Sequence, residues 1–286
     1  SGAINLEGEG VGSILKSTGA TNKILMISGD ESTRAYLGIR KLYFLSGTSG
    51  TATALLHLDY VADFIIEACS FRGNSKTTNL LILAAAQQGV VKDSVFTTGD
   101  VSIKYDRGSG GTTHSNGVEC HGNSFVSAAS KHIELNYVDS ASIHSNHFTS
   151  SPIQIDQVIA GNGCPSITSN HFELHDTGVK NQASSVYCSN NNFFGSPGAN
   201  DIYVSGGTNS VFTQNFLARN VTLTSGTYSV VFSDNYVTGT VTNTSTIYNG
   251  INNYGTKGDA VGTFNPGLTF ATVGDLSVSY LSLIHI

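Results

Sequence analysis

Ile143-His144-Ser145-Asn146-His147-Phe148 decides the fold of this chain, because its pattern returns 24 residues later as Ile167-Thr168-Ser169-Asn170-His171-Phe172. Each copy has an apolar residue first, an asparagine fourth and an aromatic ring sixth. Further copies of [Ile/Val/Cys]-x-x-Asn-x-[Phe/Tyr] follow at intervals of 18 to 29 residues. A repeat of this length is typical of a solenoid, in which no unit can bury its apolar face alone and each stacks on its neighbours.

Three columns of like residues emerge when the copies are aligned. The aromatic column consists of Phe44, Phe71, Phe96, Phe125, Phe148, Phe172, Phe193, Phe216, Tyr236 and Tyr254. Five positions before the rings stand Ile39, Ile66, Val91, Cys120, Ile143, Ile167, Cys188, Val211 and Val231, and two positions before them stand Asn123, Asn146, Asn170, Asn191, Gln214, Asp234 and Asn252. In coils stacked about 4.8 Å apart, we expect ring to meet ring. We also expect each asparagine to adopt a left-handed backbone at a bend and to bond the asparagines above and below.

A second strand precedes the motif in most coils. Apolar residues recur thirteen and fifteen positions before the ring, at Leu58, Leu83, Leu135, Leu223 and Val241 and at Leu56, Leu81, Ile133 and Val221. The alternation Ile133-Glu134-Leu135 is that of a half-buried strand. The sequence therefore predicts an all-β, single-stranded right-handed parallel β-helix of about ten coils, because parallel crossovers strongly favour the right hand. The Leu-x-x-Leu-x-Leu pattern of a leucine-rich solenoid is absent.

Composition limits the classes of partner and cofactor. The chain of 286 residues carries a net charge of −6, which disfavours nucleic acid because phosphate binding needs clustered basic residues. No apolar run reaches membrane-spanning length, so no membrane insertion is expected. Cys120 and Cys188 fall about three coils apart, beyond disulfide reach, and are interpreted as small buried hydrophobes. Gly8-x-Gly10-x-Gly12 precedes no helix and indicates a turn, so no cofactor is expected.

The opening stretch Ile4-Asn5-Leu6-Glu7-Gly8-Glu9-Gly10-Val11-Gly12-Ser13-Ile14-Leu15, with Ile39-x-x-Leu42-x-Phe44 after it, resembles the first coils of the pectate-lyase-like superfamily, in the branch that holds phage tailspikes. The resemblance spans roughly residues 4 to 256 and concerns architecture and repeat. It implies a polysaccharide-active protein, extracellular or on a virion surface, that assembles as a homotrimer. The Asn-Thr-Asp, Gly-His-Gly and Arg-Ile-Lys motifs of polygalacturonases are absent, whereas tailspike glycosidases share no short motif.

The resemblance also divides the chain. Residues 1–45 are expected to form the first coils, with the N-terminal cap of the family missing, and residues 46–256 to form the main β-helix. Residues 257–286 are expected to be a C-terminal tail. The last six residues, 281–286, resemble a translated sequencing adaptor and are not expected to be native.

Two insertions mark the candidate site, one around residues 106–114 and one around residues 160–165. Both fall between the second strand and the apolar position of the motif, so both should leave the same corner with one uninterrupted coil between them. Loops on rigid scaffolds commonly carry function, and two loops flanking a bare coil would form a groove suited to an extended glycan. The candidate substrate-binding residues are Asn136, Tyr137, Gln154, Arg107 and His114.

The candidate catalytic residues are the carboxylates Glu134, Asp156, Asp106 and Asp139. In the expected register, Glu134 stacks on Gln154 and Asn136 on Asp156. Glu134 and Asp156 then lie roughly 8 Å apart from strand spacings, within the 6.5–9.5 Å or so that inverting glycosidases use. One of the two must keep its proton near neutrality. The competing interpretation is that they are ordinary solvated carboxylates on an acidic solenoid.

Histidines stack as well, His121 on His144 and His147 on His171. Neighbouring imidazoles can bind a metal. However, the spacing forces no acidic third ligand, so these histidines are interpreted as solvated turn residues and no metal site is expected.

Three functions remain open at this stage. The first is a depolymerase that cuts bacterial surface polysaccharide by hydrolysis or β-elimination. The second is a non-catalytic glycan-binding or structural spike or adhesin. The third, an ice-binding solenoid, would need a regular threonine ladder, and Thr222, Thr224, Thr240 and Thr242 outline one over only two coils. The chain has no Trp, so tyrosines such as Tyr137 would have to supply any stacking surface for sugars.

Overall fold

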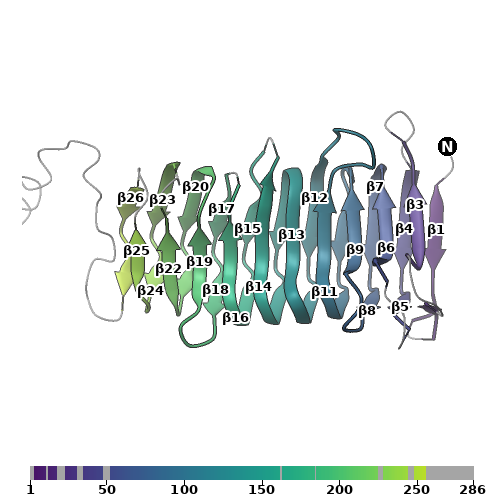
Figure 1. Ribbon diagram of the computed structural model, residues 1–286, viewed down its shortest axis with the longest axis horizontal. Helices are drawn as coiled ribbons and strands as arrows, with labels where there is room; N and C mark the ends of the chain where they lie inside the picture. Colours follow the sequence, from purple (N-terminus) through teal and green to yellow (C-terminus); the bar gives the residue numbers. More distant parts are fainter. Residues whose placement is uncertain are drawn as a thin grey trace, which may run out of the picture.

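A computed structural model describes residues 3–10, 12–17, 23–30, 35–47, 52–161, 163–183, 185–224, 228–243 and 248–255. Every regular element in these residues is a β-strand, and they contain no helix that could cross a membrane. Figure 1 shows the strands side by side in one elongated stack that begins with β1. The expected tail at 257–286, including residues 281–286, lies outside the described residues.

The strands form three columns, one for each side of the coil. The first column contains β1 (Ile4–Glu7), β4 (Ala35–Arg40), β7 (Val61–Glu67), β10 (Val90–Lys92), β12 (Ser115–His121), the end of β13 (Ser124–His144), β15 (Ser166–Thr168), β17 (Tyr187–Ser189), β20 (Thr208–Thr213), β23 (Tyr228–Ser233) and β26 (Tyr248–Ile251). This column carries the first apolar position of the repeat.

The second column carries the aromatic position. It contains β2 (Ile14–Lys16), β5 (Tyr43–Leu45), β8 (Ser70–Arg72), the starts of β11 (Val95–Asp106), β13, β14 (His147–Ala160) and β16 (His171–Asn181), and then β18 (Asn192–Phe194), β21 (Phe216–Leu217), β24 (Tyr236–Val237) and β27 (Tyr254–Gly255).

The third column completes the coil. It contains β3 (Leu25–Ser28), β6 (Ala54–Asp59), β9 (Asn79–Ala84), the later parts of β11, β13, β14 and β16, and β19 (Asn200–Val204), β22 (Asn220–Leu223) and β25 (Val241–Asn243). Each of these pairings is parallel and joins a strand to the one in the next coil. The expected parallel β-helix of about ten coils is therefore confirmed.

A column of phenylalanines fills the interior. The rings from Phe44 to Phe193 are buried, and successive ring centroids lie 4.5 to 4.9 Å apart with nearly parallel planes. Stacking at the strand spacing buries each ring between its neighbours and removes its apolar surface from water. Cys120 and Cys188 are buried and free, as expected.

Beyond Phe193, the expected aromatic column is wrong by one residue. Phe193 pairs with Leu217 rather than with Phe216. Phe216, Tyr236 and Tyr254 pair with one another one position earlier. Because successive side chains of a strand point to opposite faces, this shift moves the three rings from the interior to the surface.

The same shift affects the first apolar column. Cys188 pairs with Phe212 rather than with Val211, and Phe212 pairs with Phe232. In these later coils the phenylalanine occupies the first apolar position of the motif, and an aliphatic residue occupies the sixth. The two apolar positions have exchanged their preferred residue types, and an alignment on rings alone misses the exchange.

The asparagine column is what stays constant. Its members are Asn123, Asn146, Asn170, Asn191, Asn215, Asn235 and Asn253, with Ser94 at the same position in the coil before Asn123. Gln214, Asp234 and Asn252 were therefore expected one position too early. The backbone N–H and the Nδ2 of Asn146 both donate to Oδ1 of Asn170, at 3.0 and 3.1 Å, and its Nδ2 also donates to the carbonyl of Cys120 at 2.9 Å. Each asparagine of the column thus forms hydrogen bonds with backbone groups at the bend that would otherwise be buried without a partner.

The left-handed backbone lies beside these asparagines and not on them. The residue before each asparagine of the column has positive φ, for example Ser145 at 55° and Ser169 at 56°. The expected left-handed backbone is therefore wrong for Asn123, Asn146, Asn170 and Asn191, whereas Gln214, Asp234 and Asn252, one position before the column, do have positive φ. The asparagine side chain is selected for the hydrogen bonds between coils, and the strained position is left to the residue before it.

Candidate functional site

Two loops leave the solenoid at the same corner, as predicted. The first, at 107–114, joins β11 to β12, and the second joins β14 to β15 after Ala160. β13 passes the same corner without a loop, because Val138 pairs with Ser115 on one side and Ala160 on the other. Figure 1 shows both loops rising from the same edge of the stack.

The first loop folds onto β13 and brings four of the predicted residues together. The Arg107 guanidinium carbon lies 4.9 Å from the centre of the Tyr137 ring. Nδ1 of His114 lies 2.7 Å from Oδ1 of Asp139, and the His114 ring centre is 5.6 Å from that of Tyr137. The arrangement combines a cation held over an aromatic face with a histidine–carboxylate pair, and in both the first loop contacts the coil between the two loops.

The second loop packs directly on the same strand. A Cβ added at Gly163 would collide with the backbone of Asp139, and one added at Gly161 would collide with that of Val138. Both glycines are therefore required by this close approach. Cys164, which follows Gly163 in this loop, is exposed, whereas the other three cysteines are buried.

We expect Gly163→Ala to lower the free energy of unfolding by about 1–3 kcal/mol, because the added methyl group must push the loop off Asp139. Gly12→Ala is the control, since a Cβ there meets no atom within 4 Å. Urea denaturation of both variants measures the difference. Equal effects would show that the second loop does not rest on β13.

The predicted register of the catalytic carboxylates is wrong. Glu134 pairs directly with Asp156, and neither Gln154 with Glu134 nor Asn136 with Asp156 is a pair. The register shifts between Val126 and Lys131, where β13 has a residue more than β14. The sequence-based register instead aligned Ile133 with Ile153, whereas Ile133 pairs with Ile155, and so it placed Glu134 and Asp156 two residues apart.

One lysine lies between the two carboxylates. Nζ of Lys131 is 2.9 Å from Oε2 of Glu134 and 2.8 Å from Oδ2 of Asp156. Lys104 extends the row, with its Nζ 3.0 Å from Oδ2 of Asp106 and 3.9 Å from Oε1 of Glu134. Negative and positive groups therefore alternate across three coils. This arrangement holds two carboxylates in adjacent coils without direct repulsion between them.

Glu134 is held in its ionised form. Burial raises the pKa of this carboxyl, but hydrogen bonds from Lys131 and Asn136 and the nearby lysine charges outweigh burial, and the net effect lowers the pKa. The same contacts raise the pKa of Lys131 against the opposing effect of its burial. Glu134 therefore suits a base or a charged binding group and does not suit the proton donor of an inverting pair.

Three predicted site residues are less accessible than expected. The Asp156 side chain is only 3% exposed and accepts a hydrogen bond from Gln182 at 2.7 Å. Asn136 is buried and donates to Glu134 at 2.6 Å. Gln154 is fully buried and donates to the carbonyl of Glu173, so it does not point outward. Strand alternation predicts outward positions, but near a corner the chain turns and alternation no longer determines which side chains reach solvent.

Sequence reasoning missed a row of aromatic rings that lie at the surface. Phe194, Phe216 and Tyr236 follow one another on the outer face of the second column, with ring centres 5.3 Å apart, and the exposed Tyr254 comes next. Aligning the repeat on its asparagines instead of its rings would have placed Phe216, Tyr236 and Tyr254 on the surface. Exposed aromatic surface of this kind commonly marks an interaction site.

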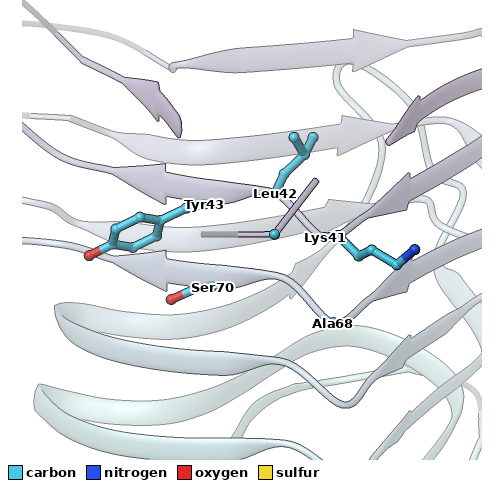
Figure 2. Close-up of a pocket in the computed structure, with 6 residues that line it drawn as sticks. Lys41, Leu42, Tyr43, Ala68 and Ser70 are labelled. Carbon is cyan, nitrogen blue, oxygen red and sulfur yellow. The ribbon is translucent and has the colours of Figure 1, made fainter. Parts of the chain in front are cut away.

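A separate pocket of about 260 Å³ lies near the N-terminal end. It is lined by Gly10, Lys41, Leu42, Tyr43, Ala68 and Ser70, where β4 bends into β5. Figure 2 shows the Lys41 and Tyr43 side chains pointing in opposite directions at this bend. Nζ of Lys41 lies 2.8 Å from Oε1 of Glu7. The lining holds no carboxylate or histidine, so the pocket does not compete with the loop corner as a candidate active site.

Comparison with known proteins shows similarity at the level of structure. No protein-family model and no curated protein matches the chain. The tailspike protein of E. coli bacteriophage HK620 in complex with a pentasaccharide matches with a TM-score of 0.60 at 8% identity, over 88% of this chain and 57% of that one.

Variants of the same tailspike, also in complex with the pentasaccharide, match equally well. A double variant with one aspartate and one glutamate replaced by alanine gives a TM-score of 0.61 at 9% identity, over 88% of this chain and 57% of that one. A variant with a glutamate replaced by glutamine gives 0.63 at 8% identity, over 83% and 51%. The chain thus spans just over half the length of these tailspikes. At this identity the likeness establishes the fold alone, and the chain shares the parallel β-helix fold of these tailspikes.

Proposed function

We propose that this protein is the polysaccharide-binding β-helix of a phage tailspike-like spike, on a virion surface, and that it depolymerises the bacterial surface glycan it binds. The observation that carries the proposal is the meeting of Arg107, His114, Tyr137 and Asp139 on the coil between the two loops. The solved tailspikes of the same fold were captured with a pentasaccharide, which supports a glycan as the ligand.

The roles of the carboxylates follow from their exposure and charge. The side chains of Asp106 and Asp139 are 29% and 30% exposed and can reach a glycan. Glu134 is ionised and lies on β13 with Tyr137 and Asp139, so it is our candidate for the base, in hydrolysis or in β-elimination. The Asp156 side chain is nearly buried and is ion-paired with Lys131. We therefore assign it the role of a positioning residue that acts through this lysine.

A non-catalytic spike or adhesin is the second candidate. The observation that favours it is the row of ion pairs. Lys131 and Lys104 are paired with the carboxylates that a hydrolase would use, namely Glu134, Asp156 and Asp106. An ice-binding surface is less well supported. Thr222 and Thr242 do stack, but the same column continues into Tyr203 and Lys180 and forms no regular threonine ladder there.

Binding and cleavage can be measured separately. A maleimide fluorophore on Cys164, the exposed cysteine of the four, reports binding beside Asp139. The labelled protein is titrated with capsular and O-antigen polysaccharides, and the unlabelled protein is assayed for new reducing ends and for unsaturated-sugar absorbance. Reducing ends without unsaturation indicate a hydrolase, and unsaturation indicates a lyase. Binding without cleavage supports the adhesin, and the absence of both from the full panel contradicts the proposal.

Substitutions test the catalytic and binding roles proposed for these residues. On a glycan that is cleaved, Glu134→Gln is expected to lower the rate by at least about 100-fold while the Cys164 signal persists, because a general base contributes that much. Tyr137→Ala is expected to weaken the binding signal itself. Glu67→Gln is the matched control, since Glu67 also pairs with two cations, Arg40 and Lys92, but lies away from the loops. If the control loses as much activity as Glu134→Gln, the catalytic assignment is wrong.

The homotrimer expected from the resemblance is part of this proposal. Sedimentation equilibrium of the intact chain tests it, because a trimer of the 30.0 kDa chain differs threefold in mass from a monomer. A monomer at all concentrations would contradict assembly by this segment while leaving glycan binding open to the titration above.

A further inference from the structure

Two histidines and a glutamate converge on the outer face of the second column. His147 begins β14, His171 begins β16, and the two are direct partners in the parallel ladder. Their ring centres lie 5.2 Å apart. Glu173 stands two residues after His171 and therefore points to the same side of the strand. Three potential metal ligands from two adjacent coils thus share one patch.

The geometry directs the donor atoms to a common point. Nε2 of His171 is 2.7 Å from Oε1 of Glu173, and Nε2 of His147 is 3.4 Å from Oε2 of the same carboxylate. One ligand atom from each residue lies within 4.8 Å of the others. A tetrahedral ion with bonds of about 2.1 Å holds its ligands about 3.4 Å apart, so small side-chain rotations close the site.

The surroundings favour a bound ion. The Phe194 ring lies 5.2 Å from that of His171 and flanks Glu173 in the next coil, which shields one side from water. The three side chains remain 39 to 48% exposed, so an ion can enter from solvent.

A neighbouring group provides an internal comparison. His121 and His144 also stack, at 5.0 Å with nearly parallel rings, and Nε2 of His144 lies 2.7 Å from Oε1 of Glu119. The residue types are the same, but these atoms do not converge as a trio. Among the described residues, three such ligands meet at His147, His171 and Glu173.

We infer that His147, His171 and Glu173 form a binding site for a divalent transition-metal ion of the Zn²⁺ class, with water in the remaining position. Two imidazoles and one carboxylate suit Zn²⁺, whereas Mg²⁺ and Ca²⁺ prefer oxygen ligands throughout. The ion would link adjacent coils, β14 to β16, and stabilise them against separation. Sequence spacing could not supply Glu173 as the third ligand, because nothing in the repeat requires a carboxylate at that position.

The test is isothermal titration of the full chain, free of any polyhistidine tag, with ZnCl₂ and separately with MgCl₂. We expect one Zn²⁺ site per chain, no comparable Mg²⁺ binding, and a rise in melting temperature with Zn²⁺. His171→Ala and Glu173→Gln should each weaken Zn²⁺ binding at least tenfold, since each removes one of three ligands. His144→Ala should leave the affinity unchanged.

Cobalt supplies a second readout that does not depend on stability. Co²⁺ in the wild-type site should give the intense visible absorption of a four-coordinate ion, and Glu173→Gln should lose it. The inference is overturned if the folded wild-type chain binds no Zn²⁺. It is overturned equally if His144→Ala weakens binding as much as His171→Ala, because the ion would then sit elsewhere. Circular dichroism confirms that each variant is folded before titration.

Discussion

Replacing Asn170 by leucine should lower the free energy of unfolding by about 4 kcal/mol, although the two side chains are similar in size. Oδ1 of Asn170 accepts the backbone N–H and Nδ2 of Asn146, and its Nδ2 donates to the carbonyl of Ile143 and to Oδ1 of Asn191. The leucine would leave at least the Asn146 N–H and the Ile143 carbonyl buried without their partners. Each such group costs about 1–3 kcal/mol.

Asn192→Leu is the matched control, since Asn192 is exposed and lies one residue beyond Asn191, the next asparagine of the column. The same chemical change on the surface should stay within about 0.5 kcal/mol. Urea denaturation followed by circular dichroism compares the two, and the midpoint should fall for Asn170→Leu at an unchanged slope. Equal midpoints for the two variants would mean that the hydrogen bonds of the asparagine column add nothing to the stability of the protein.

Lowering the pH from 7 to 4 should cost the protein about 3 kcal/mol of stability through His132 alone. This side chain is fully buried between the Phe125 and Phe148 rings. Its Nε2 lies 3.0 Å from the carbonyl of Thr149 and its Nδ1 lies 3.1 Å from Oγ of Ser102. A carbonyl only accepts, so Nε2 carries the proton and Nδ1 accepts from the serine hydroxyl in the neutral ring.

The direction of this pH dependence follows from the surroundings of His132. Burial, opposed only by the hydrogen bond to Thr149, lowers the pKa of His132 from 6.5 to about 4. Between these values the unfolded chain binds a proton that the folded chain does not, so stability is complete above pH 6.5 and falls as the pH drops towards 4. The loss ends once the folded state also takes up the proton.

His132→Gln isolates this contribution. In the next coil the same position is held by Gln154, whose Nε2 donates to the carbonyl of Glu173 just as His132 donates to Thr149. The glutamine can therefore keep the hydrogen bond without titrating. The difference between wild type and variant in the free energy of unfolding should change by about 3 kcal/mol between pH 7 and 4. A difference that is independent of pH would show that His132 is not buried in its neutral form.

The candidate site could be predicted from the sequence only in part. Insertions near Arg107 and Cys164 are visible as breaks in the repeat, so the corner and its loops could be placed before the structure was known. The contact of Arg107 with Tyr137 and the 2.7 Å pairing of His114 with Asp139 required the path of the loop, which no periodicity encodes. The lysine between Glu134 and Asp156 depended on a one-residue irregularity in β13.

The sequence by itself determined the β-helix, because stacked coils force chemically like residues into contact and leave a periodic trace. It also determined which asparagines could form a ladder, although the aromatic alignment obscured this after Phe193. Only the tertiary structure decided which rings face water, since a shift of one residue reverses the two faces of a strand. It alone also decided that His147, His171 and Glu173 meet, because their contact depends on side-chain directions across two coils that the spacing of the repeat leaves free.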